Sequence, residues 1–84
     1  KKDAIAYLSL GLVSEAGEVA GKVKKQIRDG TTSNVASEIG DVLWYCAMLA
    51  NELEANLGKI MEDNLHKLNS RKERGTLAGS GDNR

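Results

Sequence analysis

The stretch GLVSEAGEVAGKVKK, residues 11–25, decides the fold because it combines helical periodicity with acidic residues on one side. Its apolar residues, such as Leu12 and Ala16, are separated by three or four positions, which is typical of an amphipathic helix. Glu15 and Glu18 are three positions apart, so they lie one turn apart on one face. The stretch therefore predicts a helix that carries two carboxylates beside its apolar stripe.

The same spacing extends this helix in both directions, from about Asp3 to Arg28. Asp3 is a suitable N-cap residue, and Asp29 followed by Gly30 is a suitable end. We expect this first helix to bury one continuous stripe. The stripe consists of Ile5, Leu8, Leu12, Ala16, Val19, Ala20, Val23 and Ile27.

Three glycines interrupt the first helix, at Gly11, Gly17 and Gly21. Each weakens a helix by roughly 1 kcal/mol relative to alanine. Glycines retained at that cost indicate close approach by another helix or by a ligand.

Two more helices are predicted after a polar turn, Thr31 to Ser33, which offers capping side chains. The second helix runs from about Asn34 to Glu54 and the third from about Leu57 to Arg74. We therefore expect an all-α domain of about three helices over residues 1–74, followed by a Gly-rich polar tail over residues 75–84. The expected apolar stripes are Val35, Ile39, Val42, Leu43, Cys46, Leu49, Ala50 and Leu53 in the second helix, and Leu57, Ile60, Met61, Leu65 and Leu68 in the third.

Length and composition narrow the classes of function. A chain of 84 residues forms one domain with a thin core, which association with other copies would enlarge. Twelve basic and 12 acidic residues give zero net charge, which argues against binding to a nucleic-acid polymer. No apolar run approaches the roughly 18 residues of a membrane span. The single Cys46 lies in an apolar run, so we expect a buried free thiol in a reducing, cytoplasmic compartment.

A second carboxylate pair, Glu38 and Asp41, repeats the three-residue spacing on the second helix. On the helical repeat, Glu15 lies about 80° and Glu18 about 140° from the centre of their apolar stripe. The second pair lies at about 75° and 135°. In an antiparallel hairpin the four carboxylates would converge, and oxygen ligands of this kind suit Mg²⁺, with Mn²⁺ as a substitute. The alternative is that both pairs are solvated and that Glu18 forms an ion pair with Lys22, four positions along.

The third helix supplies positive charge and one polar group. Lys67, Arg71 and Arg74 form a stripe beside its apolar face, and Asn64 falls inside the apolar arc. Lys67 and Arg71 can grip phosphates. The pattern alone also fits basic residues that stabilise a helix C-terminus and an asparagine bonded to a neighbouring backbone group.

Three aromatic or imidazole side chains complete the candidates. His66, the only histidine, is expected at the surface and excludes a histidine-based metal site. Trp44 lies away from the apolar stripe and indicates a subunit contact. Tyr45 lies one turn beyond Asp41, where it either packs between helices or stacks on a base.

The segments SEAGEVAGKVKK, SEIGDVLWY and NLHKLNSRKERG together resemble the MazG family of all-α nucleoside triphosphate pyrophosphohydrolases. The resemblance runs from about Leu10 to the end of the chain. It implies Mg²⁺-dependent hydrolysis of a ribo- or deoxynucleoside triphosphate to the monophosphate and pyrophosphate, in housekeeping of non-standard or surplus nucleotides. It also implies homo-oligomers, dimers or tetramers, in which partner helices complete four-helix bundles. Ser14 departs from the family pattern, which has a glutamate there.

The resemblance also assigns roles to single residues. It implies that Glu15 or Glu38 acts as the general base, and that Lys22 and Lys25 are solvated or reach the phosphates. The alternative to an enzyme is a non-catalytic, oligomeric helical module that binds nucleotides or a partner protein, and Ser14 is the feature that supports it. The implied metal ligands are Glu15, Glu18, Glu38 and Asp41, and the implied substrate-binding residues are Tyr45, Asn64, Lys67 and Arg71.

Overall fold

The computed structural model describes residues 2–31 and 34–73, and within these ranges the chain is all-α. Helix α1 spans Lys2–Asp29, α2 spans Val35–Glu52 and α3 spans Leu57–Glu73. The prediction of three helices is confirmed, whereas a four-helix bundle completed by other copies remains a prediction. The proposed tail over residues 75–84, and Arg74, lie outside the described residues. No helix among the described residues is long and apolar enough to cross a membrane.

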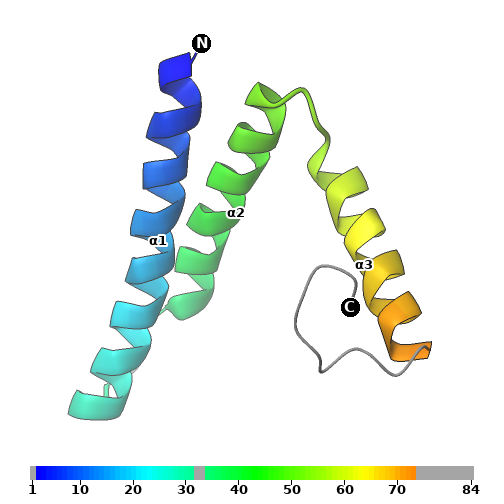
Figure 1. Cartoon of the computed structure of the whole chain (residues 1–84). Coiled ribbons are helices and arrows are strands. Elements are labelled where there is room, and N and C mark those ends of the chain that lie inside the picture. The colour runs from blue at the N-terminus through cyan, green and yellow to red at the C-terminus, as the bar shows by residue number, and fades with distance from the viewer. Residues whose placement is uncertain (1, 32–33, 74–84) are drawn as a thin grey trace.

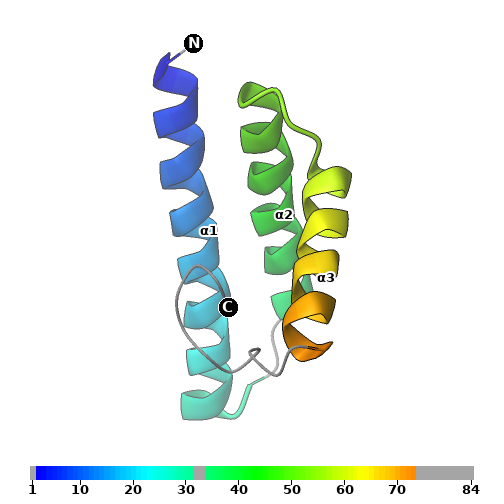
Figure 2. The same ribbon diagram turned by 45° about the vertical axis from the view of Figure 1, so that its right-hand side comes forward.

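Helices α1 and α2 form an antiparallel pair, whereas α3 leaves the far end of α2 and diverges from it (Figure 1). Among the described residues, α3 contacts α2 alone. In the turned view, α3 lies on the side of α2 that is away from α1 (Figure 2). The chain therefore consists of a helical hairpin and a third helix that is attached at one end.

Local chemistry explains where the helices start and stop. Helix α1 ends at Asp29, and the next residue, Gly30, takes a left-handed φ of 68° and donates its N–H to the Gln26 carbonyl at 2.9 Å. The predicted N-caps were wrong. Asp3 lies inside the first turn of α1, because the helix already begins at Lys2. The N-cap of α2 is Asn34, whose Oδ1 accepts from the Ser37 N–H at 3.1 Å.

The connection between α2 and α3 is a tight C-cap followed by an N-cap. Helix α2 ends at Glu52, two residues before the predicted end, because Glu54 takes a left-handed φ of 57°. The Ala55 N–H then donates to the Ala50 carbonyl at 2.8 Å, which closes the last turn. Asn56 starts α3, since its Oδ1 accepts from the Lys59 N–H at 2.9 Å.

The core is smaller than the apolar stripes predict. Only Leu8 and Ala50 are buried among the described residues, and Cys46 is half-buried rather than buried, although it is a free thiol as expected. The stripes are only partly covered because one hairpin and one diverging helix cannot enclose them. The large exposed hydrophobic residues are Ile5, Tyr7, Leu10, Val13, Val23, Ile27, Ile39, Leu43, Trp44, Leu53, Ile60, Met61 and Leu65.

Candidate metal and nucleotide site

The hairpin aligns α1 and α2 so that successive turns of one helix face successive turns of the other. Tyr45 of α2 lies against Gly11 of α1 so closely that a methyl group at Gly11 would overlap the aromatic ring. One turn along, Glu15 follows Gly11 by four residues and Asp41 precedes Tyr45 by four. The contact of Tyr45 on Gly11 thus belongs to the same register that brings the carboxylates together.

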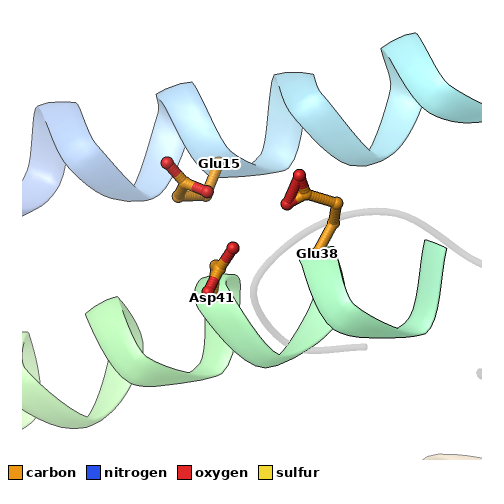
Figure 3. A group of neighbouring side chains, drawn as sticks. All are labelled: Glu15, Glu38 and Asp41. Atoms are coloured by element: carbon orange, nitrogen blue, oxygen red, sulfur yellow. The ribbon is translucent and has the colours of Figure 1, made fainter. Parts of the chain in front are cut away.

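Three carboxylates converge between the two helices. Glu15, Glu38 and Asp41 each offer an oxygen atom, and these atoms lie within 4.8 Å of one another. Figure 3 shows Glu15 pointing from α1 towards Asp41 and Glu38 on α2. Glu15 and Glu38 are half-buried at the edge of the interface, while Asp41 is exposed. The sequence predicted this edge position for Glu15 and Glu38.

Glu18 stands apart from this group. Its side chain is exposed, and it does not join the three carboxylates whose oxygens converge. Its negative charge still acts on the Glu15 carboxyl. Burial raises the pKa of the Glu15 carboxyl, and the charges of Asp41, Glu38 and Glu18 raise it further. The raised pKa therefore reflects the burial of Glu15 first and the surrounding negative charge second.

A lysine enters the cluster from α1. Lys22 Nζ lies 3.5 Å from Glu38 Oε1, so Lys22 is paired across the hairpin rather than with Glu18 on its own helix. Lys25 is exposed. Periodicity along one helix could not reveal the Lys22–Glu38 pair, because the pair depends on how two helices are aligned.

The aromatic residues lie at the end of the cluster nearest Gly11. Tyr45 is half-buried, and its ring meets the Trp44 ring edge-on, with centroids 5.0 Å apart. Trp44 is 56% exposed, which agrees with its predicted position outside the stripe. Tyr45 therefore packs between helices in this chain while remaining next to the carboxylates.

The predicted phosphate-binding residues lie on α3, which does not contact α1. Asn64 and Lys67 are exposed and line an open depression of about 340 Å³ together with Ile60, Met61 and Asp63. Arg71, one turn beyond Lys67, is half-buried, and His66 is exposed as expected. A single chain thus brings the carboxylates together but keeps the α3 residues on a separate element.

Comparison with known proteins identifies the family of this chain. Residues 4–76 match the MazG nucleotide pyrophosphohydrolase domain. The chain belongs to the MazG family. It is also 47% identical over 89 aligned positions to the Gene 37 protein of Mycobacterium phage L5, an alignment that covers 98% of this chain and 78% of that protein. No solved structure matches the chain.

Membership of the MazG family implies a divalent metal, and the acidic cluster is chemically suited to one. Mg²⁺ holds six oxygen ligands at about 2.0–2.1 Å in an octahedron, so neighbouring ligands are about 2.9 Å apart and opposite ones about 4.2 Å. The three carboxylate oxygens lie within 4.8 Å of one another, so their side chains would have to draw together by up to about 2 Å around one ion. The donor set contains oxygen alone, which suits a hard cation of this kind.

Proposed function

We propose that this MazG-family chain is a Mg²⁺-dependent nucleoside triphosphate pyrophosphohydrolase, which converts a ribo- or deoxynucleoside triphosphate and water to the monophosphate and pyrophosphate. The observation that carries the proposal is the convergence of Glu15, Glu38 and Asp41 from two helices of a MazG domain. Family membership alone implies the reaction, and the cluster supplies the oxygen ligands that it needs. Removal of surplus or non-standard nucleotides in the cytoplasm is the role we assign to it.

Glu15, Glu38 and Asp41 would hold the metal, with Glu18 as a fourth carboxylate one turn away. When bound there, Mg²⁺ would neutralise charge on the triphosphate and polarise the bond that breaks. Mn²⁺ is the expected substitute.

We propose that Glu15 or Glu38 is the general base that takes a proton from the attacking water. Glu38 is also held by the positive charge of Lys22, whereas Glu15 faces the other carboxylates of the cluster.

Tyr45 is proposed to contact the base, because its ring lies one turn from Asp41. Asn64, Lys67 and Arg71 are proposed to bind the sugar and phosphates. Since α3 does not contact α1 within one chain, these residues would reach a triphosphate at the carboxylates through movement of α3 or from another copy.

The first test is product analysis on a panel of ribo- and deoxynucleoside triphosphates, with Mg²⁺ and with EDTA. We expect metal-dependent release of pyrophosphate and monophosphate. Glu38→Gln should lower kcat by at least about a hundredfold, because it removes a carboxylate ligand. Glu62→Gln on α3, which changes the same charge beside Lys59, is the matched control and should keep full activity.

The opposite outcome is equally clear. If the folded protein hydrolyses no triphosphate with either Mg²⁺ or Mn²⁺, the proposal that it is an enzyme is contradicted. That result would favour a non-catalytic nucleotide- or protein-binding module, which the exposed Ser14 in place of the family glutamate also fits.

We also propose that the chain works as a homodimer or homotetramer. The exposed hydrophobic residues named above leave α1, α2 and α3 each with an uncovered apolar face. Sedimentation velocity at micromolar concentration should therefore give a species larger than 9.0 kDa. A monomer across the whole concentration range would contradict this part of the proposal.

A further inference from the structure

Lys22 is the cationic side chain that reaches into the acidic cluster from α1. Its ammonium lies 3.5 Å from Glu38 Oε1. The Glu38 side chain is 14% exposed, whereas the Lys22 side chain is 37% exposed. The carboxylate is therefore held at the interface, while the lysine keeps contact with water.

The pair is loose. Strong hydrogen bonds between an ammonium and a carboxylate measure about 2.7–2.9 Å, and this separation is clearly longer. Lysine carries its charge on a flexible four-carbon stem, so the ammonium can leave without a change in the helix. The Lys22–Glu38 pair can thus open at little cost.

The charge of Lys22 has two opposite consequences. Without a metal, it offsets the repulsion among three carboxylates whose oxygens lie within 4.8 Å of one another. With a divalent cation at those oxygens, the same ammonium becomes a neighbouring like charge that draws on the same Glu38 carboxylate. One interaction therefore stabilises the metal-free hairpin and opposes metal entry.

We propose that Lys22 is a tethered counter-cation that a divalent metal displaces from Glu38. It is a positioning residue, which holds Glu38 until the metal takes that carboxylate. The inference rests on the metal site of the proposed function and adds a competitor to it.

The test measures metal affinity and metal-free stability rather than turnover. Lys22→Met keeps an unbranched side chain that is one atom shorter and removes the charge. We expect it to bind Mn²⁺ about threefold to tenfold more tightly than the wild type without nucleotide, by titration calorimetry and by EPR of free Mn²⁺. In EDTA, the same variant should unfold at a lower temperature than the wild type. The variant should therefore gain Mn²⁺ affinity and lose metal-free stability.

Two variants serve as controls. Lys24→Met removes the same charge from the same helix at an exposed position, about 200° around the helix from Lys22, and should leave Mn²⁺ affinity near the wild-type value. Lys22→Arg keeps the charge and should also bind Mn²⁺ much as the wild type does.

The outcomes separate this inference from the proposed function. Wild-type protein that binds no divalent cation would overturn the metal site itself. Wild-type binding with unchanged or weaker binding by Lys22→Met would overturn the counter-cation alone, because a lysine that merely orders Glu38 predicts a loss of affinity. Equal tightening by Lys24→Met would show a general charge effect and would also overturn it.

Discussion

The hairpin of α1 and α2 and the helix α3 share amphipathic spacing but differ in how they are anchored. The hairpin joins its helices along their length, with the Tyr45 ring against Gly11 and three carboxylates converging one turn away. Helix α3 has no fully buried residue and contacts α2 alone among the described residues. The difference shows that amphipathic spacing is sufficient to make a helix, while its anchorage depends on a partner surface of matching shape.

The largest expected effect of this difference is in hydrogen exchange. Backbone amides of α3 should exchange at least about tenfold faster than those of α1 and α2 in dilute protein, because few buried contacts oppose local opening. Raising the protein concentration should slow exchange in α3 if another copy covers its apolar face. Equal protection of all three helices at every concentration would remove the distinction between the two regions.

The next effect concerns the close contact at Gly11. Gly11→Ala places a methyl group in the Tyr45 ring and should lower the free energy of unfolding by about 1–3 kcal/mol, measured by urea denaturation. Gly17→Ala is the matched control on the same helix, since, apart from its chain neighbours and the backbone of its own helix, no described residue lies within 4 Å of the added methyl. It should raise stability by up to about 1 kcal/mol. The same sign for both variants would contradict the register described for the hairpin.

The two asparagine caps give a smaller and more local comparison. Each accepts the N–H three residues along, Asn34 from Ser37 and Asn56 from Lys59, and each is worth about 1 kcal/mol. Asn34→Ala should lower the unfolding free energy of the whole hairpin. Asn56→Ala should reduce helicity in α3 alone, as seen by circular dichroism and residue-resolved exchange. If Asn56→Ala weakens α1 as much as α3, the helices unfold as one unit.

The smallest effect is the dependence of stability on pH at Glu15. Because the folded state raises the pKa of Glu15, it binds this proton more tightly than the unfolded chain does. Stability should therefore fall as pH rises through the window from the unfolded pKa to the raised folded one, and stay lower above it. Metal-free Glu15→Gln should have a higher Tm than the wild type at pH 7.

The higher Tm expected of Glu15→Gln is limited to a range of pH and can be checked against a control variant. It should vanish below about pH 4, where the wild-type carboxyl is protonated in both states. Glu62→Gln should give no gain, because it removes a carboxylate that lies beside Lys59 rather than beside other carboxylates. A gain from Glu15→Gln that persists in acid would show that its cause is not the charge.

The sequence predicted the features that repeat along a helix. Three- and four-residue spacing placed all three helices and put Glu15 and Glu38 at the edge of their stripes, as the structure confirms. It could not predict the Lys22–Glu38 pair, which depends on the register between two helices. It also overestimated burial, because apolar spacing identifies a face that can be covered without identifying what covers it.

Helix ends were predicted less well than helix interiors. The sequence pattern places Asn34 inside the second helix, whereas in the structure its side chain caps that helix. Glu54 was expected to continue that helix, since glutamate has good helix propensity. Its left-handed backbone is imposed by the hydrogen bonds that close α2, which propensity does not describe.

The edge-on contact between Trp44 and Tyr45 gives the chain an internal optical label. Trp44 is the only tryptophan, and the Tyr45 ring that it meets rests on Gly11 beside the carboxylates. Its indole emission therefore responds to displacement of that ring, while its exposed surface responds to coverage by another molecule. Fluorescence from the unmodified protein can thus report both on the register of the hairpin and on its burial in an assembly.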